Sequence, residues 1–162
     1  FKRISRQGER KTIVAVARSL SRSGDGHLYF IIPLMLWAFN VEGASHLVLL
    51  LAAAFAVERA LYLMLKGTLK RRRPANAIPG FSSVIVASDK FSFPSGHASG
   101  AFLFATCMTG IFGVPALAAY LWASGVALSR VLLGVHFPGD IVAGAIMGSS
   151  IGLLGIALLG GF

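Results

Sequence analysis

Residues 137–160 read FPGDIVAGAIMGSSIGLLGIALLG, and no charged side chain follows Asp140 in this stretch. A helix needs about 20 predominantly apolar residues to cross a bilayer. The stretch therefore predicts a membrane-spanning helix with a carboxylate near its start. Gly144, Gly148 and Gly152 recur at every fourth position, a spacing that lets two helices approach closely in lipid.

The composition of the whole chain agrees with a membrane protein. The 162 residues are 56% hydrophobic and 13% charged, with a mean hydropathy of +0.75. A water-soluble domain of this length needs more charge on its surface. The net charge of +9 would suggest nucleic acid on a soluble protein, but these basic residues gather at the ends of apolar segments. Membrane lipids or phosphate are therefore the expected partners, with no nucleic acid. The single cysteine, Cys107, excludes an internal disulfide.

Five apolar segments are candidate spans, so we expect an all-α, polytopic membrane helix bundle of about five spans. Their boundaries are residues 28–41, 46–65, 95–112, 114–134 and 137–160. The first segment is short and contains Pro33, so it needs the preceding turns to form a tilted span. No sheet is expected, because unpaired strand edges cannot lie in lipid.

The N-terminal residues have a different pattern. Within residues 1–22, basic and apolar residues alternate at helical intervals, which predicts an amphipathic helix on the membrane surface. The alternative is the tail of a span that begins before residue 1. We expect one domain over residues 1–162, with residues 1–27 interfacial and residues 28–162 forming the bundle.

Three polar blocks interrupt the apolar sequence. They are KGTLKRRRP at Lys66–Pro74, PSGH at Pro94–His97, and SRVLLGVHFPGD at Ser129–Asp140. The chain reaches one membrane face at the first block and leaves that face from the second. The 31 residues between the second and third blocks allow one crossing and return. All three blocks therefore meet at one membrane surface.

The residue types in these blocks suit a phosphate site. Lys66, Arg73 and Arg130 supply positive charge and fixed donors. Ser95 and Gly96 precede a predicted helix, whose free N–H groups and dipole favour an anion.

Three further residues suit proton and group transfer. His136 and Asp140 are four residues apart and share a helix face, so the carboxylate can hold one imidazole nitrogen while the other attacks. His97 places a second titratable group across the site.

In order and spacing, the blocks resemble those of the type 2 phosphatidic acid phosphatase family, which includes the vanadium haloperoxidases. The resemblance covers about residues 46–160. It implies that His136 attacks phosphorus and forms a phosphohistidine, that Asp140 orients His136, and that His97 protonates the departing oxygen. It also implies the phosphate-binding residues, which are Lys66, Arg73, Ser95, Gly96 and Arg130. Members of this family need no metal, and the sequence contains no metal-ligand cluster, so we expect no cofactor.

The resemblance predicts an integral-membrane lipid phosphatase. Its substrate would be a lipid phosphate such as phosphatidate, phosphatidylglycerophosphate, a prenyl phosphate or diphosphate, or lipid A. One alternative is a vanadate-dependent haloperoxidase, although those relatives are soluble. Another is a non-catalytic lipid-phosphate binding or transport bundle. The sequence leaves the oligomeric state open.

Two further groups of charged residues lie near these positions, one within the first block and one in the loop that follows it. Lys70, Arg71 and Arg72 would point in different directions on a helix, so we expect them to bind lipid headgroups or to orient the protein. Residues 75–93 form a loop that contains Asp89. This loop could cover the site or bind a lipid tail, or it could be an ordinary surface loop.

The expected location is the cell (inner) membrane. All Lys and Arg residues except Arg59 fall on the active-site face of this topology, and the opposite loops near residues 43 and 113 have none. The positive-inside rule then predicts a cytoplasmic active site. Many bacterial members of the family act on the outer face, so the resemblance favours the other orientation.

Overall fold

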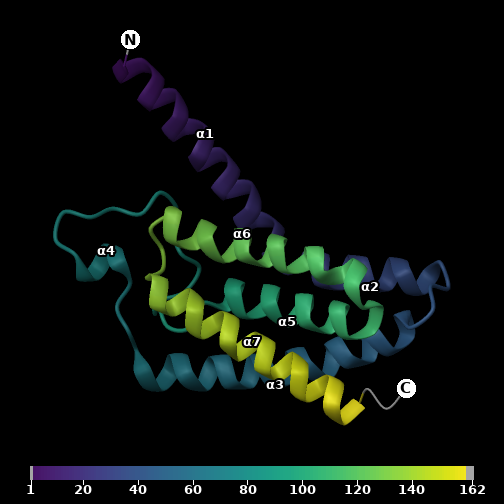
Figure 1. Cartoon of the computed structure of the whole chain (residues 1–162). Coiled ribbons are helices and arrows are strands. Elements are labelled where there is room, and N and C mark those ends of the chain that lie inside the picture. Colours follow the sequence, from purple (N-terminus) through teal and green to yellow (C-terminus); the bar gives the residue numbers. More distant parts are fainter. Residues whose placement is uncertain (1, 160–162) are drawn as a thin grey trace.

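The computed structural model describes residues 2–159, and within that range every regular element is a helix (Figure 1). This confirms the all-α prediction for the described residues. The helices are α1 (Lys2–Ser23), α2 (His27–Ala38), α3 (Ala44–Leu69), α4 (Pro74–Ala77), α5 (Gly96–Phe112), a short 3-10 helix η1 (Val114–Leu117), α6 (Ala118–Leu132) and α7 (Pro138–Leu159).

Three of the described segments are long and apolar enough to cross a bilayer. They are Ala44–Ala77, Val114–Leu132 and Pro138–Leu159. The α2 helix has 12 residues and would reach only about 18 Å along its axis, against a hydrocarbon core of about 30 Å. The turn at Gly24–Gly26 ends α1 before α2 begins, so the preceding residues do not lengthen α2. The structure therefore supports a multi-pass membrane protein with three candidate spans.

The α5 helix lies at the centre of the bundle and contacts α3, α6 and α7 (Figure 1). The closest approach is to α7, at the glycines that the sequence singled out. A Cβ atom on Gly148 would lie 2.0 Å from the carbonyl oxygen of Ser99, and one on Gly144 would lie 2.5 Å from that of Ser95. Glycine is therefore required at both positions, and this contact fixes the start of α5 against the start of α7.

The α1 helix joins the bundle only through its C-terminal part (Figure 1). Ala17 and Ser21 are buried there, and Leu20 packs against Gly125 of α6. The indole of Trp122 donates a hydrogen bond of 2.9 Å to the hydroxyl of Ser23. The expected N-terminal helix is present, and it packs on protein at the end that leads to the site.

Candidate active site

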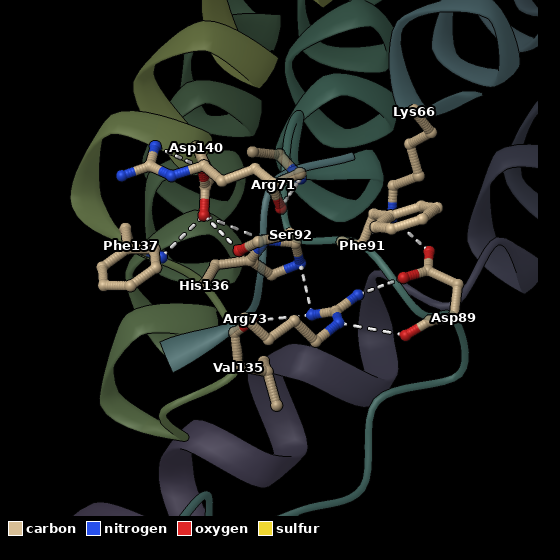
Figure 2. Close-up of polar contacts among 12 residues, drawn as sticks. Lys66, Arg71, Arg73, Asp89, Phe91, Ser92, Val135, His136, Phe137 and Asp140 are labelled. Atoms are coloured by element: carbon tan, nitrogen blue, oxygen red, sulfur yellow. Dashed lines mark hydrogen bonds and ion pairs between the residues drawn. The ribbon is translucent and has the colours of Figure 1, made fainter. Parts of the chain in front are cut away.

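Lys66 and Arg73 come from the first polar block and meet at the carboxylate of Asp89 (Figure 2). Lys66 also donates to the carbonyl of Phe91 at 2.8 Å. Tyr62 donates to the same carboxylate at 2.6 Å. Both cations are buried, so each needs an anionic or hydrogen-bonding partner in this position. The loop before α5 supplies that partner.

The acidity of Asp89 follows from these contacts. Partial burial alone would raise its pKa, but the hydrogen bonds from Lys66, Tyr62 and Arg73 lower the pKa of Asp89 to about 2. Asp89 is therefore an anion at any physiological pH. A phosphoryl group that used the same Lys66 and Arg73 donors would have to displace this carboxylate.

His136, which belongs to the third polar block, lies beside Arg73 of the first block (Figure 2). The Nε2 atom of His136 is 3.4 Å from Nη1 of Arg73, which also donates to the carbonyl of Val135 at 2.6 Å. Burial lowers the pKa of His136, and Arg73 and Arg130 lower it further against the opposing effect of Asp140. The imidazole is therefore neutral at neutral pH, the form that can act as a nucleophile.

Asp140 is fully buried at the start of α7, but its carboxylate is not hydrogen-bonded to His136 in this structure. Its Oδ2 atom lies 3.7 Å from Nδ1 of His136, and that nitrogen has no hydrogen-bond partner among the described residues. The carboxylate instead accepts hydrogen bonds from the hydroxyl of Ser92 and from the amide of Phe137. The expected pairing of Asp140 with His136 is thus close in space, and its orienting role stays a prediction.

Arg71 is the other partner of Asp140, with 2.8 Å between Nη1 and Oδ1 (Figure 2). We expected Lys70, Arg71 and Arg72 to lie on a helix and to bind lipid headgroups or to orient the protein. The helical placement of Arg71 was wrong, and the headgroup or orienting role stays a prediction. The α3 helix ends at Leu69, and Lys70 adopts the left-handed conformation with φ of 46°. Residues 71 and 73 then follow outside any helix, and both side chains turn towards the site.

The start of α5 brings the second block into the same region. Ser95 is the N-cap of α5, and its hydroxyl accepts from the amide of Ala98 at 3.4 Å. The amide of Ser95 donates to the carbonyl of Asp140 at 3.1 Å, which ties the second block to the third. Gly96 faces Tyr62, because a Cβ atom there would lie 2.9 Å from the Tyr62 ring.

His97 and Arg130 both contact the end of α1, which the sequence did not lead us to expect. The Nε2 atom of His97 lies 2.8 Å from Oδ1 of Asp25. Arg130 is buried and donates through Nη1 to the hydroxyl of Ser21, whereas its Nε has no hydrogen-bond partner among the described residues. The N-terminal segment therefore forms one wall of the site.

The structure thus brings the predicted site residues from all three blocks to one end of the bundle. A family model described as the PAP2 superfamily matches residues 47–160. The chain belongs to the PAP2 superfamily. The sequence-based assignment to the membrane lipid phosphatases of this family is confirmed.

Similar curated PAP2 relatives are bacterial lipid phosphatases. The decaprenylphosphoryl-5-phosphoribose phosphatase of Mycobacterium tuberculosis (strain ATCC 25618 / H37Rv) is 29% identical over 153 residues, covering 94% of this chain and 84% of the relative. The lipid A 4'-phosphatase of Bacteroides thetaiotaomicron is 36% identical over 88 residues, covering 52% of this chain and 39% of the relative.

Two solved structures share the fold. Aquifex aeolicus LpxE has a TM-score of 0.76 at 26% identity, covering 90% of this chain and 86% of that one. The PAP2-type phosphatidylglycerolphosphate phosphatase of Bacillus subtilis has a TM-score of 0.65 at 22% identity, covering 95% of this chain and 86% of that one. The second likeness concerns the fold alone.

Four polar residues at this PAP2 site lie outside the three blocks or were given another role: Asp25, Arg71, Asp89 and Ser92. Asp25 also lies outside the region that the family model matches. The sequence feature that could have indicated Asp25 is Gly24-Asp25-Gly26, a turn pattern immediately after a predicted helix. Asp89 was visible only as an acid in a loop that could cover the site. Such loops have no periodicity from which to place a side chain.

Proposed function

We propose that this membrane lipid phosphatase hydrolyses a terminal phosphate monoester or diphosphate of a lipid through a phosphohistidine on His136. The observation that carries the proposal is the position of His136, which is buried with Nε2 3.4 Å from the guanidinium of Arg73. A neutral imidazole beside a cation that can hold the phosphoryl oxygens is what in-line attack on phosphorus needs.

The reaction has two balanced steps. In the first, Nε2 of His136 forms a bond to phosphorus, the bond from phosphorus to the leaving oxygen breaks, and His97 gives its proton to that oxygen. In the second, the oxygen of a water molecule forms a bond to phosphorus, the bond from phosphorus to Nε2 of His136 breaks, and His97 takes a proton from the water. Inorganic phosphate then leaves with His136 neutral again. Asp140 stabilises the charged imidazole from 3.7 Å. Positioning and charge stabilisation supply most of the catalysis in phosphoryl transfer.

The phosphate-binding residues divide by position. Lys66, Arg73 and Arg130 are buried cations at this end of the bundle, and they would neutralise the phosphoryl oxygens. Ser95 and Gly96 would present the N-terminal amides of α5 to the same group. Displacement of Asp89 would free Lys66 and Arg73 for this task.

A hollow between α2 and α3 supports lateral access of a lipid. A cavity of about 840 Å³ is lined by His97 and Gly96 at the site and by Tyr29, Phe30 and Phe55 farther along. Tyr29, Phe30 and Phe55 also line a neighbouring apolar cavity of about 350 Å³. An acyl or prenyl tail could lie in these hollows while its phosphate reaches His136.

The substrate class includes phosphatidate, phosphatidylglycerophosphate, prenyl phosphates and diphosphates, and lipid A. The names of the Mycobacterium and Bacteroides relatives favour either a prenyl-phosphoryl sugar phosphate or lipid A.

The proposal also keeps five membrane spans, of which α2 and α5 are the two shorter ones, within one domain over residues 1–162. We further propose that the active site faces the cytoplasm.

The test is phosphate release in detergent from a panel of lipid phosphates and diphosphates, without added metal. We expect release by the intact protein and none by His136→Ala, with folding of the variant checked by its melting temperature. Release that persists in His136→Ala would overturn the assignment of the nucleophile. Binding without release from any lipid would favour a non-catalytic lipid-phosphate bundle, and vanadate-dependent halide oxidation would favour a haloperoxidase.

A further inference from the structure

A second cavity adjoins the site on the side of α1. Its volume is about 230 Å³, and its polar lining comes from Arg18, Ser21, Arg22 and Asp25 of the N-terminal segment and from His97 and Arg130 of the site, with Ser88 of the loop before α5. The α1 residues lie outside the region that the family model matches. The cavity is therefore built in part by residues that the three blocks do not include.

The fold places two arginines of α1 at this cavity. Arg18 and Arg22 are four residues apart, so they share one face of the helix. Ala17 and Ser21 precede them and are buried against the bundle, which fixes the rotation of α1. Gly24 then lets the chain pass close to the site, because a Cβ atom there would lie 2.6 Å from Val126 and 3.4 Å from His97.

The lining is positive and incompletely paired. Arg18, Arg22 and Arg130 line the cavity together with one carboxylate, Asp25, whose Oδ1 is already 2.8 Å from Nε2 of His97. Arg18 also donates to the carbonyl of Val84 at 3.3 Å. Arg130 is 5% exposed, and its buried Nε has no hydrogen-bond partner among the described residues. A buried charged donor without a partner is costly, so an anion beside Arg130 would satisfy it.

The direction of the cavity follows from His97, and this step rests on the proposed function. His97 is the group that protonates the leaving oxygen, so the leaving part of the substrate passes His97. The cavity begins at His97 and extends to Arg18 and Arg22. His97 also lines the hollow proposed for the tail, so the group next to the leaving oxygen lies where the two spaces meet, beside the positively charged cavity.

We propose that this cavity is a second anion subsite, which binds a phosphate retained on the leaving group. The preferred substrates are then amphiphiles with two phosphates in sequence. The second phosphate can be the inner phosphate of a diphosphate, or a phosphodiester that joins the lipid to a phosphorylated alcohol. Phosphatidate and a prenyl monophosphate lack this group.

The experiment compares substrates that share a tail and differ in the second phosphate. One pair is a prenyl diphosphate and the prenyl monophosphate, and the other is phosphatidylglycerophosphate and phosphatidate. We expect the full chain in detergent to have the higher kcat/KM for the doubly phosphorylated member of at least one pair. That pair tells whether the second phosphate is a diphosphate or a phosphodiester.

Variants that remove the charge of Arg18 or Arg22 test whether these residues cause the preference for the doubly phosphorylated substrate. In Arg18→Gln and Arg22→Gln, we expect the ratio of kcat/KM between the two members to fall by about tenfold, the loss typical of one charge-assisted hydrogen bond. Arg10→Gln is the matched control, because Arg10 is an exposed residue of the same helix and does not line the cavity. Its ratio should equal that of the unmodified protein.

Inhibition by a compound that is not hydrolysed keeps the test independent of differences between the lipid tails. Methylenediphosphonate, which is not hydrolysed, should inhibit the unmodified protein at a lower concentration than inorganic phosphate, and Arg22→Gln should remove most of that difference. Equal losses for both members of a pair in Arg18→Gln and Arg22→Gln would overturn the subsite and indicate a general effect of charge. So would faster hydrolysis of both monophosphates by the unmodified protein. Failure to release phosphate from every lipid would instead contradict the proposed function.

Discussion

Asp89 and Arg73 form an ion pair through one carboxylate oxygen and Nη2, at the entrance to the proposed phosphate site. Nη1 of the same guanidinium lies 3.4 Å from Nε2 of His136. One arginine therefore joins an internal anion to the proposed nucleophile. A substrate phosphate that binds Arg73 competes with Asp89 for it.

Removal of this internal anion should strengthen phosphate binding. In Asp89→Asn, vanadate, a phosphate analogue, should bind about tenfold more tightly, which corresponds to the loss of ~1.4 kcal/mol of competition. The measurement is inhibition of phosphate release by vanadate, supported by calorimetry on the solubilised protein. Glu42→Gln is the control, because Glu42 is an exposed acid that lines a different cavity beside His46 and Phe112. Weaker vanadate binding in Asp89→Asn would instead mean that Asp89 positions Lys66 and Arg73 for the substrate.

Arg71 should matter for turnover, whereas its neighbour Arg72 should not. Arg71 holds Oδ1 of Asp140 at 2.8 Å, so Arg71→Gln would release one side of a fully buried carboxylate. We expect kcat to fall by about tenfold or more, as for the loss of a hydrogen bond to a charged group. Arg72→Gln removes the same charge one residue away and should retain kcat. Equal effects of the two variants would support a headgroup role for the whole basic run.

The acidity of His136 gives a titration test. Its pKa is lowered by burial and then by Arg73 and Arg130 against the effect of Asp140, so the imidazolium should form only below the ordinary histidine value of about 6.5. An NMR titration of labelled histidine, with the resonance assigned by its loss in His136→Ala, measures this directly. Arg130→Gln removes a positive charge that disfavours the imidazolium, so the pKa of His136 should rise in that variant. A midpoint at or above the ordinary value in the unmodified protein would contradict the electrostatics of the site.

The contact between α5 and α7 should tolerate no side chain at Gly148. A Cβ atom there would lie 2.0 Å from the backbone oxygen of Ser99, so Gly148→Ala would force the two helices apart. The expected cost is about 1–3 kcal/mol of stability from overpacking, seen as a lower melting temperature in detergent. Gly67→Ala is the matched control, because Gly67 is helical and a Cβ atom there would meet nothing within 4 Å. Equal melting temperatures for the two variants would show that the helices can separate without cost.

The sequence was informative where the membrane restricts the chain. Apolar helices that must cross a bilayer leave few possible topologies, so the order of spans and polar blocks was enough to place Lys66, His97 and His136 on one face. The spacing of Gly144 and Gly148 likewise indicated a close helix contact. In both cases a periodic pattern, or a minimum length, fixed where a side chain must lie.

The remaining residues of the site depend on backbone that has no period. Arg71 faces Asp140 because α3 ends at Leu69 and Lys70 adopts φ of 46°. Position 70 is neither glycine nor proline, so the sequence did not indicate that the helix ends there. Asp25 and Asp89 reach the site from a turn and from a loop, where neither helical spacing nor hydropathy places a side chain. Sequence reasoning could identify them as charged residues near the site, and only tertiary packing could pair them with His97 and Arg73.

The proposed cytoplasmic orientation can be decided by cysteine labelling in intact cells. Ser82→Cys lies on the active-site face in the exposed loop before α5, and Glu42→Cys lies between α2 and α3 near the opposite end. Both changes are made in a Cys107→Ser background, because Cys107 is the single native cysteine and is buried. If the excess of Lys and Arg beside the site sets the orientation, a membrane-impermeant maleimide should label position 42 only. Labelling at position 82 alone would place the site on the outer face, and disruption of the membrane should then expose position 42.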